Sequence, residues 1–267
     1  MFDRIFIATF SRNAEKTALE YGMGIELNDL CISSNLDEDK FGTVLDRMRR
    51  RIDAAGQSGR KVIMHGPFTE LSPASIDHLA VEMMLKRYRQ TLVFCERLGI
   101  NDLVLHDGYL PLIYHKDWHK KRSVAFWKSF AEELPEGMTV YVENVFDDEP
   151  FLLTEIIGAV GRDSVKICLD VGHANAMRGD GPEVVEWIKV MAPLIGHFHL
   201  HNNDGTADLH NDIDCGTMDI RSVLETINGF CSPDVTLTVE SRESGPSVRF
   251  LREYFCGGQR FSEKSKN

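Results

Sequence analysis

Three histidines stand at alternate positions of one short apolar run, IGHFHLHNND, which spans residues 195–204. They are His197, His199 and His201. Imidazole rings bind metal ions and transfer protons near neutral pH. Alternate side chains of an extended strand point to one face, so a strand here would present all three rings on the same side. The spacing therefore predicts a strand with a row of inward-facing imidazoles.

Further imidazole and carboxylate groups follow other short apolar runs, and seven of the ten histidines lie at or near the end of such a run. The predicted cluster consists of His65, His106, Glu143, Asp170, His173, His199, Asp208, His210 and Glu240. Burying several carboxylates together is unfavourable unless a positive charge compensates them. Mixed His, Asp and Glu ligation suits Zn²⁺ or Mn²⁺. We therefore predict that this cluster binds a divalent metal ion.

Three neighbouring residues have more than one interpretation. We expect His197, the deepest of the row, to be a hydrogen-bonded core residue. His201 is assigned to substrate binding, with metal ligation as the alternative. Arg242 lies just past Glu240, and it either clamps a phosphate or carboxylate of the substrate or is an exposed arginine at the rim.

Eight short runs rich in Val, Ile and Phe must position these residues. Each is bounded by Gly, Pro, Asp or Asn and is too short for a helix, so each predicts a strand. The runs are Arg4–Thr9, Gly24–Leu30, Lys61–Phe68, Asp102–Gly108, Met138–Val145, Val165–His173, Ile195–Asn203 and Val235–Ser241. Segments with helical spacing separate them, and Gly99 ends the clearest one.

Eight strand-then-helix units predict an α/β fold of the (β/α)8 TIM-barrel class, with parallel strands ringed by helices. An open doubly wound sheet is the alternative, but its glycine-rich phosphate turn is missing from ATFSRNAEK, which follows the first strand. We predict one domain over residues 1–256. The polar tail, residues 257–267, is expected to fray. In such a barrel the site lies at the carboxyl ends of the strands.

Composition narrows the function further. The 267 residues carry a net charge of −11, which disfavours a nucleic-acid partner because phosphate backbones require Lys and Arg. The sequence contains no apolar stretch long enough for a membrane span and no secretory pattern at its start. The six cysteines are scattered without a CxxC pair, which indicates reduced thiols. We expect a cytoplasmic protein.

Seven short motifs carry a family resemblance. They are HGPF (65–68), HDG (106–108), VEN (142–144), DVGH (170–173), HFHLH (197–201), DLH (208–210) and VES (239–241). In this order the chain resembles the xylose isomerase-like barrel superfamily, which includes sugar isomerases, sugar epimerases and the endonuclease IV group.

For an isomerase or epimerase, the resemblance implies one metal held by Glu143, Asp170, His199 and Glu240. The endonuclease IV group holds up to three zinc ions, and the positions that match its additional ligands are His65, His106, His173, Asp208 and His210. Two features depart from that group. Phe68 and Thr69 stand where it has a Tyr and a Leu, and Asp214-Cys215-Gly216 replaces its Gly-acid-Gly turn.

Three functions remain open, and the first is favoured. A metal-dependent isomerase or epimerase would act on a sugar or sugar derivative, with Glu143 and Glu240 removing and returning a proton beside a metal-polarised carbonyl. A multi-zinc phosphoester hydrolase is the alternative. The third is a barrel that binds a metabolite without turning it over. The number of bound ions distinguishes the first two.

Overall fold

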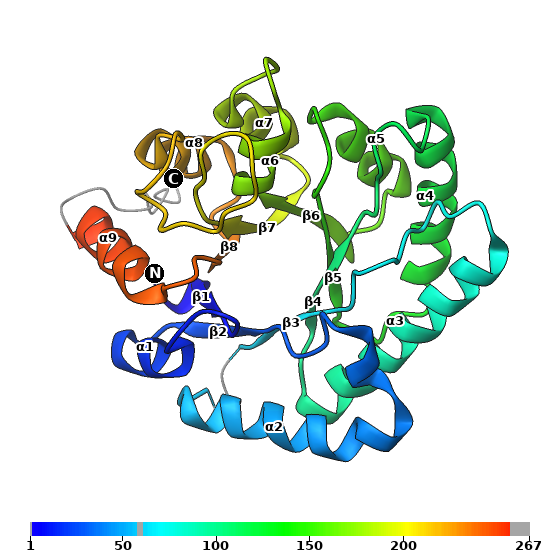
Figure 1. The fold of residues 1–267 in the computed structure, drawn as a ribbon, viewed down its shortest axis with the longest axis horizontal. Helices are drawn as coiled ribbons and strands as arrows, with labels where there is room; N and C mark the ends of the chain where they lie inside the picture. The colour runs from blue at the N-terminus through cyan, green and yellow to red at the C-terminus, as the bar shows by residue number, and fades with distance from the viewer. Residues whose placement is uncertain (1, 58–60, 257–267) are drawn as a thin grey trace, which may run out of the picture.

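The computed structural model describes residues 2–57 and 61–256. Its strands form a closed barrel in chain order, and β1 pairs with β8 in parallel to close it (Figure 1). The strands are β1 (Ile5–Ala8), β2 (Gly24–Leu27), β3 (Ile63–His65), β4 (Asp102–His106), β5 (Thr139–Glu143), β6 (Val165–Asp170), β7 (Ile195–Leu200) and β8 (Thr236–Val239). The predicted (β/α)8 fold is confirmed.

Helices follow the strands and surround the barrel (Figure 1). The α-helices are α1 (Ala14–Tyr21), α2 (Phe41–Ala54), α3 (His78–Leu98), α4 (Lys116–Ala131), α5 (Phe151–Val160), α6 (Val171–Met177), α7 (Val184–Met191), α8 (Ile220–Phe230) and α9 (Ser244–Cys256). The short 3₁₀ helices are η1 (Phe2–Arg4), η2 (Ser33–Leu36) and η3 (Glu38–Lys40). Gly99 ends α3 in the left-handed conformation, with a φ of 66°, as its position predicts.

Strand alternation sorts side chains between two cores. Outward-facing residues such as Val142 and Phe198 belong to the large core that lies between strands and helices. A smaller cluster fills the barrel interior; it consists of Phe6, Ile63, Val104, Tyr141 and Cys168. These interior residues lie below the strand ends, so the polar side chains of the predicted site rest on a packed floor.

The sixth predicted strand is three residues too long. β6 ends at Asp170, and α6 begins at the next residue, because the Asp170 carboxylate accepts a hydrogen bond from the backbone N–H of His173 at 2.7 Å. His173 therefore lies in the first turn of a helix, from which its ring still reaches the site.

Two further expectations concern the chain as a whole. The barrel extends from β1 to α9, while the predicted tail, residues 257–267, lies outside the described residues, so the domain boundary stays a prediction. Within residues 2–57 and 61–256, each helix is too short or too polar to cross a membrane.

Candidate metal centre

A cavity of about 470 Å³ opens at the carboxyl ends of the strands. Seven of the predicted site residues line it: His65, His106, Glu143, His173, Asp208, His210 and Glu240. Asp170 and His199 lie directly beneath and are fully buried. The structure thus brings all nine predicted ligands to one end of the barrel, where their ligand atoms form several close groups.

The first ligand group forms where β3, β4 and β5 end. The Nε2 atoms of His65 and His106 each lie 3.2 Å from Glu143 Oε2. All three side chains end a strand and point inward, which is why they meet. Two imidazoles and one carboxylate oxygen could supply three of the four ligands of a tetrahedral zinc site.

The second group shares Glu143 with the first. His199 Nδ1 lies 3.2 Å from Glu143 Oε1, 3.7 Å from Asp170 Oδ2 and 3.5 Å from Glu240 Oε2. One nitrogen therefore faces three carboxylates that come from β5, β6 and the end of β8. Because Glu143 directs one oxygen into each group, its carboxylate can bridge two ions.

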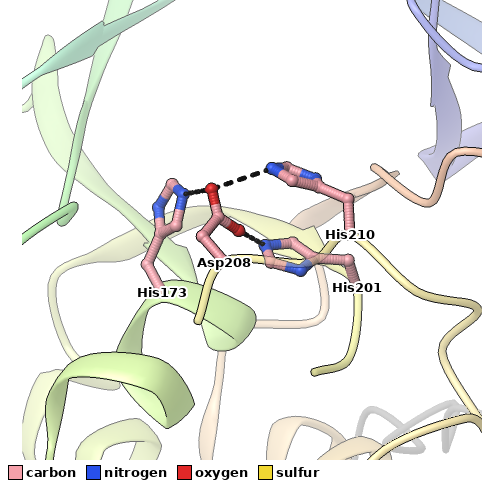
Figure 2. Close-up of side chains that lie close together, drawn as sticks. All are labelled: His173, His201, Asp208 and His210. Atoms are coloured by element: carbon pink, nitrogen blue, oxygen red, sulfur yellow. Dashed lines mark ion pairs between the residues drawn. The ribbon is translucent and has the colours of Figure 1, made fainter. Parts of the chain in front are cut away.

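The third group surrounds Asp208 at the mouth of the cavity. Asp208 Oδ2 lies 3.5 Å from His173 Nε2 and 3.2 Å from His210 Nε2, while Oδ1 lies 3.6 Å from His201 Nε2. Figure 2 shows the carboxylate of Asp208 between these three rings. Asp208 and His210 belong to the loop between β7 and α8, whereas His173 comes from α6. A loop and a helix thus complete a set that the strands alone do not supply.

Backbone carbonyls fix the orientation of three histidine rings. The Nδ1–H groups of His65, His173 and His210 donate to the carbonyl oxygens of Gly66, Asn144 and Glu240, at 2.9, 3.0 and 2.7 Å. Because a carbonyl only accepts, each ring must carry its proton on Nδ1 and present an unprotonated Nε2 to the cluster when neutral. Such a contact is the usual support of a metal-binding histidine.

Asn144 and Gly172 help to position residues of the second and third groups. The Asn144 side chain accepts from the Asp170 N–H at 2.8 Å and donates to the Asp170 carbonyl at 3.0 Å, which ties β5 to β6. A Cβ atom at Gly172 would lie 2.0 Å from His201 Cε1, so only glycine allows the ring of His201 to pack there.

The donor set fits divalent cations. Asp170 Oδ2 and both ring nitrogens of His199 and His201 are buried and make no hydrogen bond of good geometry within the described part of the chain. Yet His199 lies within 3.7 Å of three carboxylates. A cation between these converging polar atoms would satisfy them, and a donor set of His, Asp and Glu suits Zn²⁺ or Mn²⁺.

Without a cation, the carboxylates and imidazoles of the cluster shift one another's pKa. Burial raises the pKa of Asp170, but His173 and His201 outweigh burial and lower it to about 2. Burial lowers the pKa of His210, but Asp208 and Glu240 outweigh burial and raise it to about 9. Burial also lowers the pKa of His173, but Asp170, Asp208 and Glu143 outweigh burial and raise it well above its usual value. Protons on His173 and His210 therefore offset part of the carboxylate charge, and a bound cation would displace them.

Three other residues were considered from the sequence. His197 is fully buried and contacts Thr236 Oγ1 at 2.6 Å and Glu26 Oε2 at 3.2 Å, which confirms a hydrogen-bonded core residue. His201 is also fully buried, outside the cavity lining and 3.0 Å from Asp170 Oδ1, a position that favours support of the ligands or ligation over substrate contact. Arg242 is exposed and does not line the cavity.

Sequence reasoning missed Glu26. It lies on β2, is fully buried, and contacts both His197 and His199 at 3.2 Å. Its inward direction followed from alternation within GIEL, but a single carboxylate in a strand gave no further signal. Cys31 was also overlooked as a site residue, although it lines the cavity beside His65.

The upper walls of the cavity are apolar. They include Phe10, Ile32, Phe68, Phe146 and Met177, and no Lys or Arg lines this cavity in the described ranges. The Phe10 ring meets that of His210 edge-on at 5.4 Å. Positive charge for an anionic substrate would therefore have to come from bound cations or from protonated histidines such as His173 and His210.

Comparisons with known proteins agree with the barrel fold. Residues 17–254 match the family model described as xylose isomerase-like TIM barrel. An uncharacterized protein of Methanocaldococcus jannaschii is 27% identical over 223 residues, which cover 77% of this chain and 74% of that protein.

Solved structures share the fold over almost the whole length. A Thermus thermophilus protein, from crystals soaked with ZnCl2, has a TM-score of 0.74 at 24% identity and covers 96% of this chain and 99% of its own. A D-tagatose 3-epimerase-like protein has a TM-score of 0.72 at 22% identity and covers 94% of this chain and 97% of its own. At this identity the likeness supports the barrel architecture.

Proposed function

The chain belongs to the xylose isomerase-like TIM barrel family, and from this premise we propose that it is a metal-dependent hydrolase of small phosphoesters. The sequence alone favours an isomerase. The third ligand group shifts the balance, because chemistry at a single ion needs only the second group.

The contacts around Asp208 carry this proposal. Its two oxygens lie 3.2 to 3.6 Å from the Nε2 atoms of three histidines, and two of these rings are held by backbone carbonyls with Nε2 facing Asp208. A surface salt bridge requires no such support. The arrangement instead suits a separate ion at the mouth of the cavity.

Charge balance favours several ions over one. Glu143, Asp170, Asp208 and Glu240 supply four carboxylates to the three groups, and Glu26 adds a fifth behind His199. One divalent cation leaves three of these negative charges uncompensated, whereas three cations leave an excess of one positive charge. That excess suits an anionic phosphoester and replaces the Lys and Arg that are missing from the described cavity lining.

Bound divalent ions would supply positive charge to the phosphoryl oxygens and lower the pKa of an attacking water. Glu143 would hold the first and second groups at a fixed separation, since its two oxygens face different histidines. Asp208 and His210, half-exposed at the mouth, would be reached first by a substrate. The Phe10 ring packs edge-on against the ring of His210 and covers part of it. We place small molecules before nucleic acids as substrates because the chain carries a net charge of −11.

A sugar isomerase or epimerase is the second candidate, and the uncharged walls of the cavity favour it. Glu143 and Glu240 lie 3.2 and 3.5 Å from the same atom, His199 Nδ1, so they flank one point of the second group. Two carboxylates around one ion could remove and return a proton beside a carbonyl. The likeness to the D-tagatose 3-epimerase-like protein is consistent with this chemistry.

Metal counting together with two assays separates the candidates. Protein loaded with zinc and desalted is analysed by mass spectrometry of its metal content, then assayed with bis(4-nitrophenyl) phosphate. We expect close to three zinc ions per chain and release of 4-nitrophenol. Asp208→Asn should lose one ion and slow hydrolysis at least tenfold, whereas Asp163→Asn, at an exposed aspartate before β6, should change neither.

The isomerase assay uses a panel of ketoses and aldoses in deuterated water, with NMR detection of exchange at the carbon beside the carbonyl. One ion per chain together with such exchange would replace the hydrolase proposal with the second candidate. Three ions with neither activity would leave the metal centre standing and exclude both reactions on the substrates tested.

A further inference from the structure

A second cavity, of about 350 Å³, lies beside the metal centre. It is enclosed by the loops that follow β3, β4 and β5. The two cavities share four lining residues, Phe68, His106, Val145 and Phe146. A ligand bound at the cations can therefore extend into this side cavity past Phe68 and Phe146.

The walls of the side cavity are aromatic and aliphatic. The aromatic and aliphatic side chains of the lining include Phe68, Leu71, Tyr109, Tyr114 and Phe146. Glu70 is the one carboxylate in the described lining, which contains no Lys or Arg. Such a surface offers rings for stacking and no partner for an anion. Its occupant is therefore not an anion, and walls formed mostly by rings and aliphatic side chains suit an uncharged ring better than a cation.

The cavity is formed before a ligand arrives. Gly108 has a φ of 69°, and a Cβ at this position would lie 2.8 Å from Ser72 Cα, so the loops after β3 and β4 are in close backbone contact. The Phe68 ring stacks on His106 with centroids 4.3 Å apart and planes at 8°. This stacking fixes a flat face between the two cavities.

Phe146 lines both cavities and is 43% exposed. Leaving much of an aromatic ring in water is unfavourable compared with covering it. A flat ligand ring placed between Phe146 and Phe68 would cover the side of Phe68 that faces away from His106 and part of the exposed Phe146 ring. The absence of Lys and Arg from the described lining, the flat face of Phe68 and the exposed ring of Phe146 thus all favour a flat aromatic ligand.

We propose that the side cavity binds a flat, uncharged aromatic ring that is joined to the group held at the metal centre. The proposal rests on the proposed function, since it assigns the rest of the phosphoester substrate: an aryl or nucleobase-bearing phosphoester rather than an aliphatic one.

Calorimetry with zinc-loaded protein tests the assignment, with phenyl phosphate and methyl phosphate as probes. Burial of the ring predicts that phenyl phosphate binds about tenfold or more tightly than methyl phosphate. Phe146→Ala should bring the two affinities within about threefold by weakening the binding of phenyl phosphate alone. Methyl phosphate then reports that fold and metal centre are intact. Phe230→Ala, which removes another exposed ring at the end of α8, should leave the ratio unchanged.

Failure of this proposal can be distinguished from failure of the proposed function. Equal affinities for the two phosphates in wild-type protein would overturn the ring site and leave the phosphoester proposal intact. If neither phosphate binds, the phosphoester proposal fails, and saturation-transfer NMR with phenol decides about the cavity. A phenol signal that Phe146→Ala abolishes supports the ring site, and its absence overturns it. Thymidine 5′-monophosphate serves as a further probe that distinguishes a nucleobase from a phenyl ring.

Discussion

Glu26 Oε1 lies 3.2 Å from Nε2 of His199, whose other ring nitrogen faces Glu143, Asp170 and Glu240. The second oxygen of Glu26 accepts from the Thr238 hydroxyl at 2.5 Å. A carboxylate held from below thus determines which nitrogen of His199 points at the metal centre.

We expect Glu26→Gln to weaken zinc binding about 10- to 100-fold, because the amide no longer provides a full negative charge behind the imidazole. Competition with a chromophoric chelator measures the affinity. Glu20→Gln, at an exposed position of α1, is the matched control. An unchanged zinc affinity in Glu26→Gln would show that His199 needs no support from below.

Sequence reasoning placed the strands because alternation and turn residues are local signals. It also identified the nine candidate ligands, because seven of them lie at or just past the end of an apolar run, while Asp208 and His210 lie in the loop after the seventh run, in the DLH motif of the family resemblance. It did not find the partners of Glu26, because a strand pattern gives the face of a residue and its order along the strand, but not which residues lie opposite it across the barrel. The third group depends on the path of the loop between β7 and α8. Hydrogen bonds of Asn202 and Asn203 set that path, and no periodicity encodes them.

Gly172→Ala tests the packing of His201. The new methyl group would meet the His201 ring at 2.0 Å, so ring or helix must move. We expect a loss of about 1–3 kcal/mol in the free energy of unfolding, as for other overpacked sites. Urea unfolding followed by circular dichroism measures the loss. Gly229→Ala in α8 meets no atom within 4 Å and should instead be neutral or slightly stabilising.

Asp147 predicts a pH-dependent stability. Burial, followed by the nearby Asp107, raises the pKa of this carboxyl well above its usual value. Charged Asp147 therefore destabilises the fold above its folded pKa, and the effect disappears below the unfolded pKa, where both states are neutral. We expect Asp147→Asn to stabilise the protein by about 1 kcal/mol at pH 7.5 and by much less at pH 4.

Parallel urea titrations of variant and wild type at the two pH values measure this difference. Asp234→Asn, at an exposed turn, should show none. If Asp147→Asn stabilised the protein more at pH 4 than at pH 7.5, the raised pKa of Asp147 in the folded state would be contradicted.

Removal of bound metal should lower the melting temperature. Ions that bind only the folded chain stabilise it by about 2.7 kcal/mol per site at a hundredfold excess over Kd. Chelation of a zinc-loaded sample should therefore lower Tm by about 5 °C or more in differential scanning fluorimetry. Asp208→Asn should retain part of this shift, because the first and second groups remain. An identical Tm before and after chelation would mean that the buried carboxylates need no cation.

The third ligand group is built on supports that do not depend on an ion. Asparagines anchor its loop, and carbonyl oxygens orient two of its rings. If the proposed third ion is bound, replacing Asp208 and His210 would therefore remove it without disturbing the frame. Two substitutions in one loop would thus change the number of ligands at the mouth of the cavity while the strands that position the first and second groups stay as they are.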